Sequence, residues 1–479
     1  GGPNVAIGNS SGAALTTGSS NTLVGSSTSI GATTSFNTIM GHGAGNTSIG
    51  SNNTTLGTYA LSGATGAITS TVAVGRGALT GALTVAASGA TAVGYSTLSG
   101  LTTGANNTAV GRNAANAITT GSYNTALGAY SRSSATGSNN TIIGNNSGTT
   151  AIGSSNTLVG QQVANTTAAA VNNLVAVGKG ALVGALTVGA NNTVAVGASS
   201  LTALTSGAYN CAVGFQSGTS ITTGGNNALF GQNTKSSATA SNNVIAGNNA
   251  GATTIGGSNV VVGASAFNAV VGAVNSCVAI GASALSGALN VTVAGGAVAV
   301  GNSSLAALTT GEYCTAVGTN SLSGVTTGAS NTAFGYGAGS GITTGSTNTC
   351  VGHGANVSGA TAVGQIAIGR SATASANNCA QIGQATNSGT NATMKFRSQV
   401  VSDEAWIGTG TAPASIDNNG NIIKSAVSGS VQRITAVAPT PGPAVPASPN
   451  VTTATTLITT TGTAGAATGT LPAGTVDGQ

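Results

Sequence analysis

A short pattern of polar and apolar positions recurs along most of the chain. A typical copy reads Asn, Thr, apolar, apolar, Gly, as in "NNTAVG" ending at Gly111 and "YNTALG" ending at Gly128. Short alternating runs that contain β-branched residues and are bounded by glycine are typical of strands rather than helices. We therefore predict a strand at each copy, a turn at segments such as "TTG" or "SGA", and a second short strand near "ALS".

The glycine that ends each copy sets the period. The first series of these glycines is Gly8, Gly25, Gly41, Gly50, Gly57, Gly75 and Gly94, and the same series of spacings restarts at Gly111. A third series starts at Gly214 and differs only in its last step, from Gly281 to Gly301, which is longer by one. The sequence thus contains super-repeats of 103 residues, each made of six units of about 17 residues. They lie at about 1–103, 104–206 and 207–310, with a partial copy at 311–383.

Two sets of repeat positions are expected to be structural. The glycines are Gly25, Gly41, Gly111, Gly128, Gly144, Gly214, Gly231 and Gly247. The asparagines are Asn21, Asn37, Asn107, Asn124, Asn140, Asn210, Asn227 and Asn243. Stacked in register, the asparagine amides would form a hydrogen-bonded ladder. The alternative is that asparagine merely suits the backbone geometry of a turn.

A period of this kind is typical of a stacked architecture, because no single unit can bury its own apolar face. Proline is absent between Pro3 and Pro413, and proline is excluded from central strands because it cannot donate to a ladder. We therefore predict an all-β fold, a parallel β-roll or β-solenoid shaft, for residues 1–383. About 22 coils would make a rod on the order of 105 Å long.

Most apolar side chains of the repeats are small. Because alanine and valine cannot fill a wide coil, a single slender solenoid would bury little area per residue, and oligomerisation would supply the missing burial. We favour a homotrimer of parallel chains around one axis, although the composition is also compatible with two chains or one.

The composition departs from that of ordinary globular proteins, since 3% of the residues are charged, 3% are aromatic and glycine supplies 77 of 479. Such chains are often disordered, but an apolar fraction of 40% in regular positions favours an ordered structure. The five cysteines include no C-x-x-C pair, which argues against a disulfide framework or a zinc site. Cys211 and Cys314 are expected to occupy matching repeat positions as small buried residues. No apolar run is long enough to span a membrane.

Acidic residues are missing from most of the chain, because residues 1–311 contain neither Asp nor Glu. Acid-base pairs, carboxylate metal sites and a Ser-His-Asp triad cannot be built there within one chain. Asp403 and Glu404 are adjacent and would point to opposite faces of a strand, so we interpret them as solvated surface charges. We predict no enzymatic activity and no cofactor.

His42 and His353 each follow a repeat glycine. The equivalent residues of the other copies are Asn145 and Asn248, which indicates an ordinary turn position. A trimer could instead gather three copies of one histidine around a metal ion on its axis.

Arg76, Lys179, Arg112 and Arg370 also follow repeat glycines, so we expect them on the solvent side of the turn. As a group they are too dispersed along the sequence for a nucleic-acid track, which needs clustered charge and aromatic rings. The tyrosines are expected to be isolated surface residues, although they could offer stacking faces for sugars. The segment "GYGAGSG" at 335–341 lacks the Lys-Ser/Thr ending of a phosphate-binding loop.

The repeat ends after Gly383, and three further segments follow. We predict a transition module at 384–438, which contains Trp406, and an extended proline-rich linker at 439–450. Residues 451–479 read as the start of a C-terminal β domain.

The repeats "NNTAVGRNA" and "NTAFGYGAGSGITTGSTNTCVG" resemble those of phage and large-virus tail or capsid fibres. They are similar also to the "S-V-A-I-G" repeats in the head of trimeric autotransporter adhesins, which form left-handed parallel β-rolls in a homotrimer. The resemblance covers about residues 1–383 and implies a trimeric fibre at the virion surface or in the extracellular space. The implied partners are further copies of the chain, other fibre or virion proteins, and a host receptor or glycan, without nucleic acid and without insertion into a membrane.

The sequence departs from the autotransporter pattern after "SVQRITAVA", where a proline-rich stretch follows instead of heptads. A viral or phage fibre for host attachment is therefore favoured over a bacterial trimeric surface adhesin. A third possibility is an ice- or surface-binding β-solenoid. Regular T-x-T arrays would favour that function, whereas we expect the threonines to cluster in turns.

Overall fold

The computed structural model describes residues 2–148, 151–289 and 295–383, and the strands 414–416 and 422–424. The chain divides into two compact units, Gly1–Ala385 and Thr386–Gln479. In the second unit, β24 (Ala414–Ile416) and β25 (Ile422–Lys424) pair in antiparallel orientation. The rest of the predicted transition module, the linker and the start of the C-terminal β domain lie outside the described residues.

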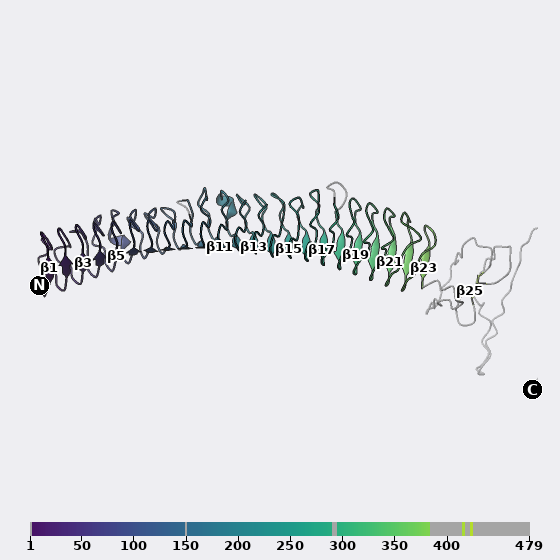
Figure 1. The fold of residues 1–479 in the computed structure, drawn as a ribbon, viewed down its shortest axis with the longest axis horizontal. Helices are drawn as coiled ribbons and strands as arrows, with labels where there is room; N and C mark the ends of the chain where they lie inside the picture. Colours follow the sequence, from purple (N-terminus) through teal and green to yellow (C-terminus); the bar gives the residue numbers. More distant parts are fainter. Residues whose placement is uncertain (1, 149–150, 290–294, 384–413, 417–421, 425–479) are drawn as a thin grey trace, which may run out of the picture. The chain divides into compact units, whose positions relative to one another are not determined.

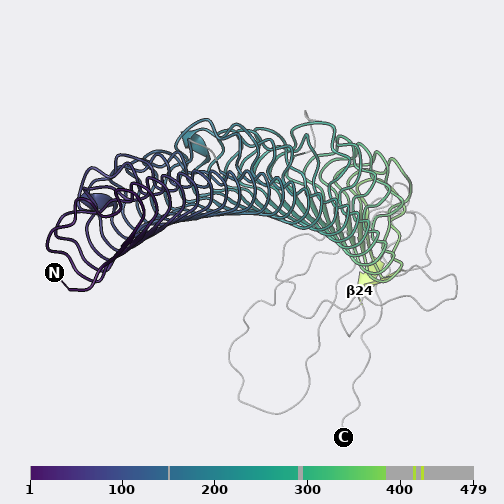
Figure 2. The same ribbon diagram turned by 60° about the vertical axis from the view of Figure 1, so that its left-hand side comes forward.

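The repeats fold into a parallel β-solenoid with one three-residue strand in each coil (Figure 1). Each strand pairs in register with the strands of the coils before and after it, so that Thr108 lies beside Thr125 and Ala109 beside Ala126. The prediction of a parallel solenoid of about 22 coils of ~17 residues is thus confirmed. Figure 2 shows the coils of this unit stacked side by side along a gently curved axis.

The strands that build this sheet follow one another in chain order. They are β1 (Val5–Ile7), β2 (Thr22–Val24), β3 (Thr38–Met40), β4 (Thr54–Leu56), β5 (Val72–Val74), β6 (Thr91–Val93), β7 (Thr108–Val110), β8 (Thr125–Leu127), β9 (Thr141–Ile143), β10 (Thr157–Val159), β11 (Val175–Val177), β12 (Val194–Val196), β13 (Cys211–Val213), β14 (Ala228–Phe230), β15 (Val244–Ala246), β16 (Val260–Val262), β17 (Val278–Ile280), β18 (Val298–Val300), β19 (Thr315–Val317), β20 (Thr332–Phe334), β21 (Thr349–Val351), β22 (Ile366–Ile368) and β23 (Ala380–Ile382). Two longer coils also contain short 3-10 helices, η1 (Val85–Ala87) and η2 (Val188–Ala190).

Two details of the predicted coil are wrong. No strand forms at the first "ALS" segment, because its leucine, Leu61, turns the chain with a left-handed φ of 58°. The short steps from Gly41 to Gly50 and from Gly50 to Gly57 belong to a single coil, since Gly50 lies between β3 and β4 and ends no strand. The apolar residue before it, Ile49, points into the core from another side of the coil. The same correction applies to Gly153 and Gly256.

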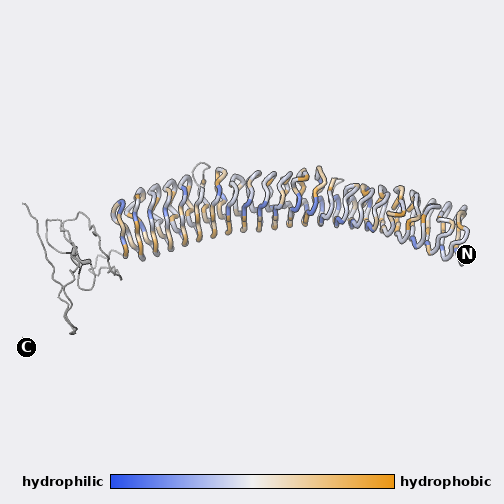
Figure 3. Tube along the Cα trace, turned by 180° about the vertical axis from the view of Figure 1, so that it is seen from behind, coloured by the Kyte–Doolittle hydropathy of each residue, from blue (hydrophilic) through white to orange (hydrophobic). Residues whose placement is uncertain are grey.

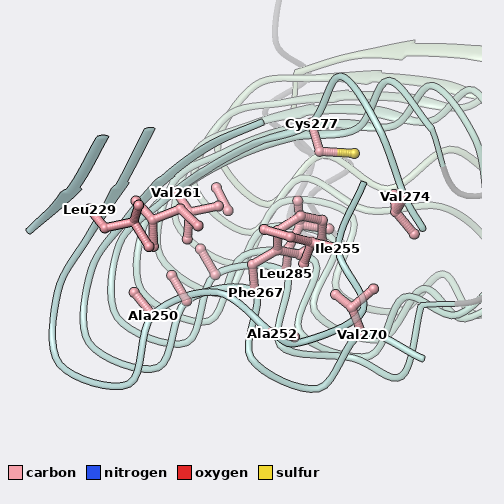
Figure 4. Close-up of a cluster of buried hydrophobic side chains, with 14 of the residues drawn as sticks. Leu229, Ala250, Ala252, Ile255, Val261, Phe267, Val270, Val274, Cys277 and Leu285 are labelled. Atoms are coloured by element: carbon pink, nitrogen blue, oxygen red, sulfur yellow. The ribbon is translucent and has the colours of Figure 1, made fainter. Parts of the chain in front are cut away.

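The core is a column of side chains that point inward from all sides of the coils. The middle residue of a strand is buried, as at Ala109 and Ile142. Residues at the corners complete each layer, and Figure 4 shows Phe267, Ile255 and Leu285 close together inside the solenoid. Because neighbouring coils supply the contacts above and below each layer, burial depends on stacking rather than on any single repeat.

Candidate interaction surfaces and the ladder that positions them

The predicted structural asparagines lie in one buried column beside the strands. The Oδ1 atom of Asn107 accepts hydrogen bonds from the backbone N–H and from Nδ2 of Asn124, both at 3.0 Å. Asn124 Oδ1 accepts the same pair of bonds from Asn140, again at 3.0 Å. Asn124 Nδ2 also donates to the carbonyl of Gly137 at 2.8 Å. The left-handed backbone conformation of this turn belongs to the residue before each ladder asparagine, as at Asn106 with φ 54°. The ladder between coils therefore explains the ladder asparagines better than turn geometry does.

The column holds all eight predicted asparagines. They are Asn21, Asn37, Asn107, Asn124, Asn140, Asn210, Asn227 and Asn243. Asn37, for example, donates from its backbone N–H to Asn21 Oδ1 at 3.0 Å. The repeat pattern had identified the position, and the structure adds the direction in which each amide points.

The ladder is interrupted at regular intervals, which sequence reasoning missed. After Asn156 the column holds Leu174, whose backbone N–H donates to Asn156 Oδ1 at 2.9 Å. The next position is Thr193, and its hydroxyl is buried without a hydrogen-bond partner in the described part of the chain. The ladder resumes at Asn210. The sequence does contain a signal for this interruption, because the spacing of the repeat glycines increases after Gly160.

The predicted structural glycines end strands and form a second column. Gly25, Gly41, Gly111, Gly128, Gly144, Gly214, Gly231 and Gly247 have φ angles from 126° to 140°. A Cβ atom at Gly128 would lie 2.5 Å from the carbonyl oxygen of Gly144 in the next coil. Backbone conformation and coil spacing therefore both require glycine at this column.

The outer face of the sheet carries a long apolar file. The first and third residues of a strand point outward, so in β7 the middle residue is buried while Val110 is 37% exposed. Figure 3 shows apolar residues recurring along the strand edge of successive coils. We call the outward third residues of β1 to β23 the apolar file. Its most exposed members include Ile7, Met40, Leu56, Phe230, Phe334 and Ile382.

Threonines occupy the outward first position of many strands, which corrects the expectation that they cluster only in turns. A continuous run extends over β6 to β10, from Thr91 to Thr157. From β11 to β18 the position holds valine, cysteine or alanine instead. The outer sheet face is therefore a mixed file of threonine and aliphatic side chains.

The basic and aromatic turn residues are closer together than their sequence spacing indicated. Arg76 and Arg112 are exposed, as predicted, but each lies over a tyrosine of the next coil. The ring of His42 lies edge-on to Tyr59, with centroids 5.3 Å apart. The tyrosines at these turns are therefore paired rather than isolated, because one coil step brings residues about 17 positions apart into contact.

His353 is paired in a similar way. Its ring stacks on that of Tyr336, with ring centroids 5.1 Å apart and an interplanar angle of 16°. Among the described residues, no three His, Cys, Asp or Glu side chains are close enough together to share a metal ion within the chain. Asp403 and Glu404 lie outside the described residues.

The cysteines occupy different positions from those expected. Cys211 is the first residue of β13 and is partly exposed, whereas Cys314 is buried and precedes β19 in the column of the asparagine ladder. The two positions do not match, because the longer step from Gly281 to Gly301 shifts the register by one. Cys350 is the buried middle residue of β21, and burial raises the pKa of its thiol to about 11.

No helix among the described residues is long and apolar enough to cross a membrane. The chain matches no protein-family model and no curated protein.

Proposed function

We propose that the chain is a structural protein, the shaft of a viral or phage fibre, in which three parallel copies pack through the apolar file. The shaft is built from super-repeats of 103 residues and holds an attachment site at a distance from the particle. This function needs no catalytic group and no cofactor, and the partners are other copies of the chain, other virion proteins and a host surface.

The observation that carries the proposal is the extent of the apolar file and its threonine neighbours. The two outward positions of a strand are roughly 7 Å apart, and 22 coil steps of about 4.8 Å give a face of roughly 700 Å². Threonine forms part of this face, and its remaining aliphatic strip matches the largest apolar patches found on monomers, about 300–600 Å², which are often functional. Side chains such as Phe230 and Phe334, 46% and 44% exposed, would be covered in an assembly.

The same face argues against ice binding. Recognition of a crystal lattice requires a regular array, but the threonine file is interrupted from β11 to β18 and protruding phenylalanines occur at the third position of β14 and β20. A bacterial trimeric adhesin would use the same shaft. Sequencing the complete gene separates these two assignments, because an adhesin gene would also encode a coiled coil and a membrane-anchoring barrel.

The trimer is tested by substitution on three consecutive coils. Leu127→Glu, Ile143→Glu and Val159→Glu, combined in one variant, place charge in the apolar file. The wild-type chain should have three times the chain mass of 44.6 kDa by light scattering, and the variant should be monomeric with unchanged circular dichroism.

The control places the same charges two residues further on, at the turn of the same coils. This second variant combines Ala129→Glu, Asn145→Glu and Gln161→Glu and should remain trimeric. A monomeric wild-type chain would refute the proposed assembly, as would a trimer that persists when the apolar file carries the three glutamates.

A further inference from the structure

Arginine and tyrosine side chains gather on one stretch of the solenoid surface. We call this group the Arg-Tyr patch, and it consists of Arg76, Tyr95, Arg112, Tyr130 and Arg132. Cζ of Arg76 lies 5.6 Å from the centre of the Tyr95 ring, and Cζ of Arg112 lies 4.6 Å from that of Tyr130. Arg132 approaches the Tyr130 ring at 5.6 Å. We propose that the Arg-Tyr patch binds an acidic polysaccharide through contacts between its guanidinium groups and the carboxylate or sulfate groups of the polymer.

The patch is a direct result of coil stacking. Arg76, Tyr95 and Arg112 each follow a strand-ending glycine in three consecutive coils. The backbone holds them in register, because Ser96 N–H donates to the Arg76 carbonyl and Asn113 N–H donates to the Tyr95 carbonyl. Consecutive coils are about 4.8 Å apart, so the backbones of Arg76 and Arg112 are about 10 Å apart along the solenoid.

The positive charge of the patch has no counter-ion within residues 1–311. Residues 1–311 contain neither Asp nor Glu, so no carboxylate of this region can neutralise it. Arg76 and Arg112 are exposed, and the Nε atom of Arg132 is buried without a hydrogen-bond partner in the described part of the chain. A planar guanidinium binds a carboxylate or a similar oxyanion through two parallel hydrogen bonds. The tyrosine rings restrict the arginine side chains, which reduces the entropy lost when a ligand binds.

The solenoid itself does not require these side chains. The positions 103 residues further along the chain hold Lys179, Ala198, Phe215, Asn233 and Lys235. The strands of those coils pair in the same parallel register. Folding alone therefore does not explain the paired arginines and tyrosines, and the later copy offers a matched control surface with two cations.

The geometry favours a polysaccharide over a nucleic acid. Binding of single-stranded nucleic acid relies on open aromatic faces on which bases stack, but guanidinium groups lie over both tyrosine rings of the patch. Cations about 10 Å apart, two coils from each other, can each bind one acidic group of an extended polysaccharide.

The experiment measures binding of the full chain to four immobilised polymers at physiological salt. The probes are polygalacturonate, which carries carboxylates, heparin, which carries sulfates, neutral dextran, and oligothymidylate. We expect binding to at least one acidic polysaccharide and none to dextran. The comparison of polygalacturonate with heparin identifies the preferred acidic group. The patch lies within one chain, so this inference holds whether or not the chain forms a trimer.

Variants locate the binding to the patch. Arg76→Gln combined with Arg112→Gln should weaken binding by about tenfold or more. Tyr130→Asn, which introduces the residue found 103 positions later, should also weaken binding although the net charge is unchanged. The control variant, Lys179→Gln with Lys235→Gln, removes the same charge and should bind within about twofold of wild type.

Three results would overturn the inference. They are the absence of binding to both acidic polysaccharides, an equal loss of affinity in the lysine control, and tighter binding to oligothymidylate than to either polysaccharide. Circular dichroism of each variant verifies that the solenoid is intact.

Discussion

Substitution of one buried asparagine should destabilise the stack far more than its small side chain implies. Asn124→Ala removes the Oδ1 acceptor of the Asn140 backbone N–H and of Asn140 Nδ2, each bonded at 3.0 Å. It also removes the Nδ2 donor that reaches the Gly137 carbonyl at 2.8 Å. The Asn140 N–H and the Gly137 carbonyl thereby lose these partners in a buried column. A buried polar group left without a partner costs about 1–3 kcal/mol, so two of them predict a loss of about 2–6 kcal/mol.

Urea denaturation followed by far-ultraviolet circular dichroism measures this loss. Stacked repeats unfold as coupled local units rather than in one step. Amide hydrogen exchange at residues 107–143 should therefore be measured together with the urea denaturation. We expect exchange to accelerate at the coils of β7 to β9 and to change little at β19 to β21.

The matched control is Asn145→Ala, which alters an exposed asparagine in the adjacent turn. Its only described side-chain bond is a long one of 3.4 Å to the Ala129 carbonyl, so the expected change is within about 0.5 kcal/mol. If Asn124→Ala were as mild as this control, the ladder would not stabilise the stack and our explanation of the asparagine column would fail.

Three further predictions follow from single columns of the solenoid. In urea denaturation, Gly128→Ala should lower the free energy of unfolding by more than about 2 kcal/mol, because its Cβ would lie 2.5 Å from the Gly144 carbonyl oxygen. Gly337→Ala should lower it by only about 1 kcal/mol, because Gly337 has φ 62° and its Cβ would meet open space. Thr193→Asn should stabilise the chain by about 1 kcal/mol, because it replaces an unpartnered buried hydroxyl with an amide that can bond to the next asparagine; a lower urea midpoint would contradict this. Burial raises the pKa of the Cys350 thiol from 9.0 to about 11, so the contribution of this thiol to stability is complete below pH 9.0 and is lost as the pH rises to about 11. Over this pH range the free energy of unfolding of the wild type should fall by about 2–3 kcal/mol more than that of Cys350→Ala. Parallel pH profiles of the two proteins would refute this prediction.

The sequence predicted the stacked architecture because its period is set by backbone contacts. A glycine at each strand end is required by a left-handed φ and by the carbonyl of the next coil, as at Gly128. The asparagine that precedes most strands is required by hydrogen bonds to both neighbouring coils, as at Asn124. Such requirements recur from coil to coil, so they are visible in a single sequence.

The direction of the side chains was harder to predict. An apolar residue before glycine occurs both on the outward face, as at Val110, and in the core, as at Ile49. The two sites share a local pattern and differ only in their place on the coil, so Gly50 was assigned to a separate unit. The Arg-Tyr patch was missed because contacts between coils join residues that are far apart in sequence, such as Arg112 and Tyr130.

The central claim, that the coils stack in parallel with one strand per coil, is tested most directly by a distance between coils. Spin labels are placed at positions 145 and 248, shortly after the ends of β9 and β15, which are six coils apart. The labelled variant lacks the native cysteines and is diluted with unlabelled chain. Stacking predicts a narrow distribution of backbone separations centred at about 29 Å, broadened by the label linkers. A broad distribution centred at about 50–60 Å, as expected for an unstructured segment of about 100 residues, would contradict the account.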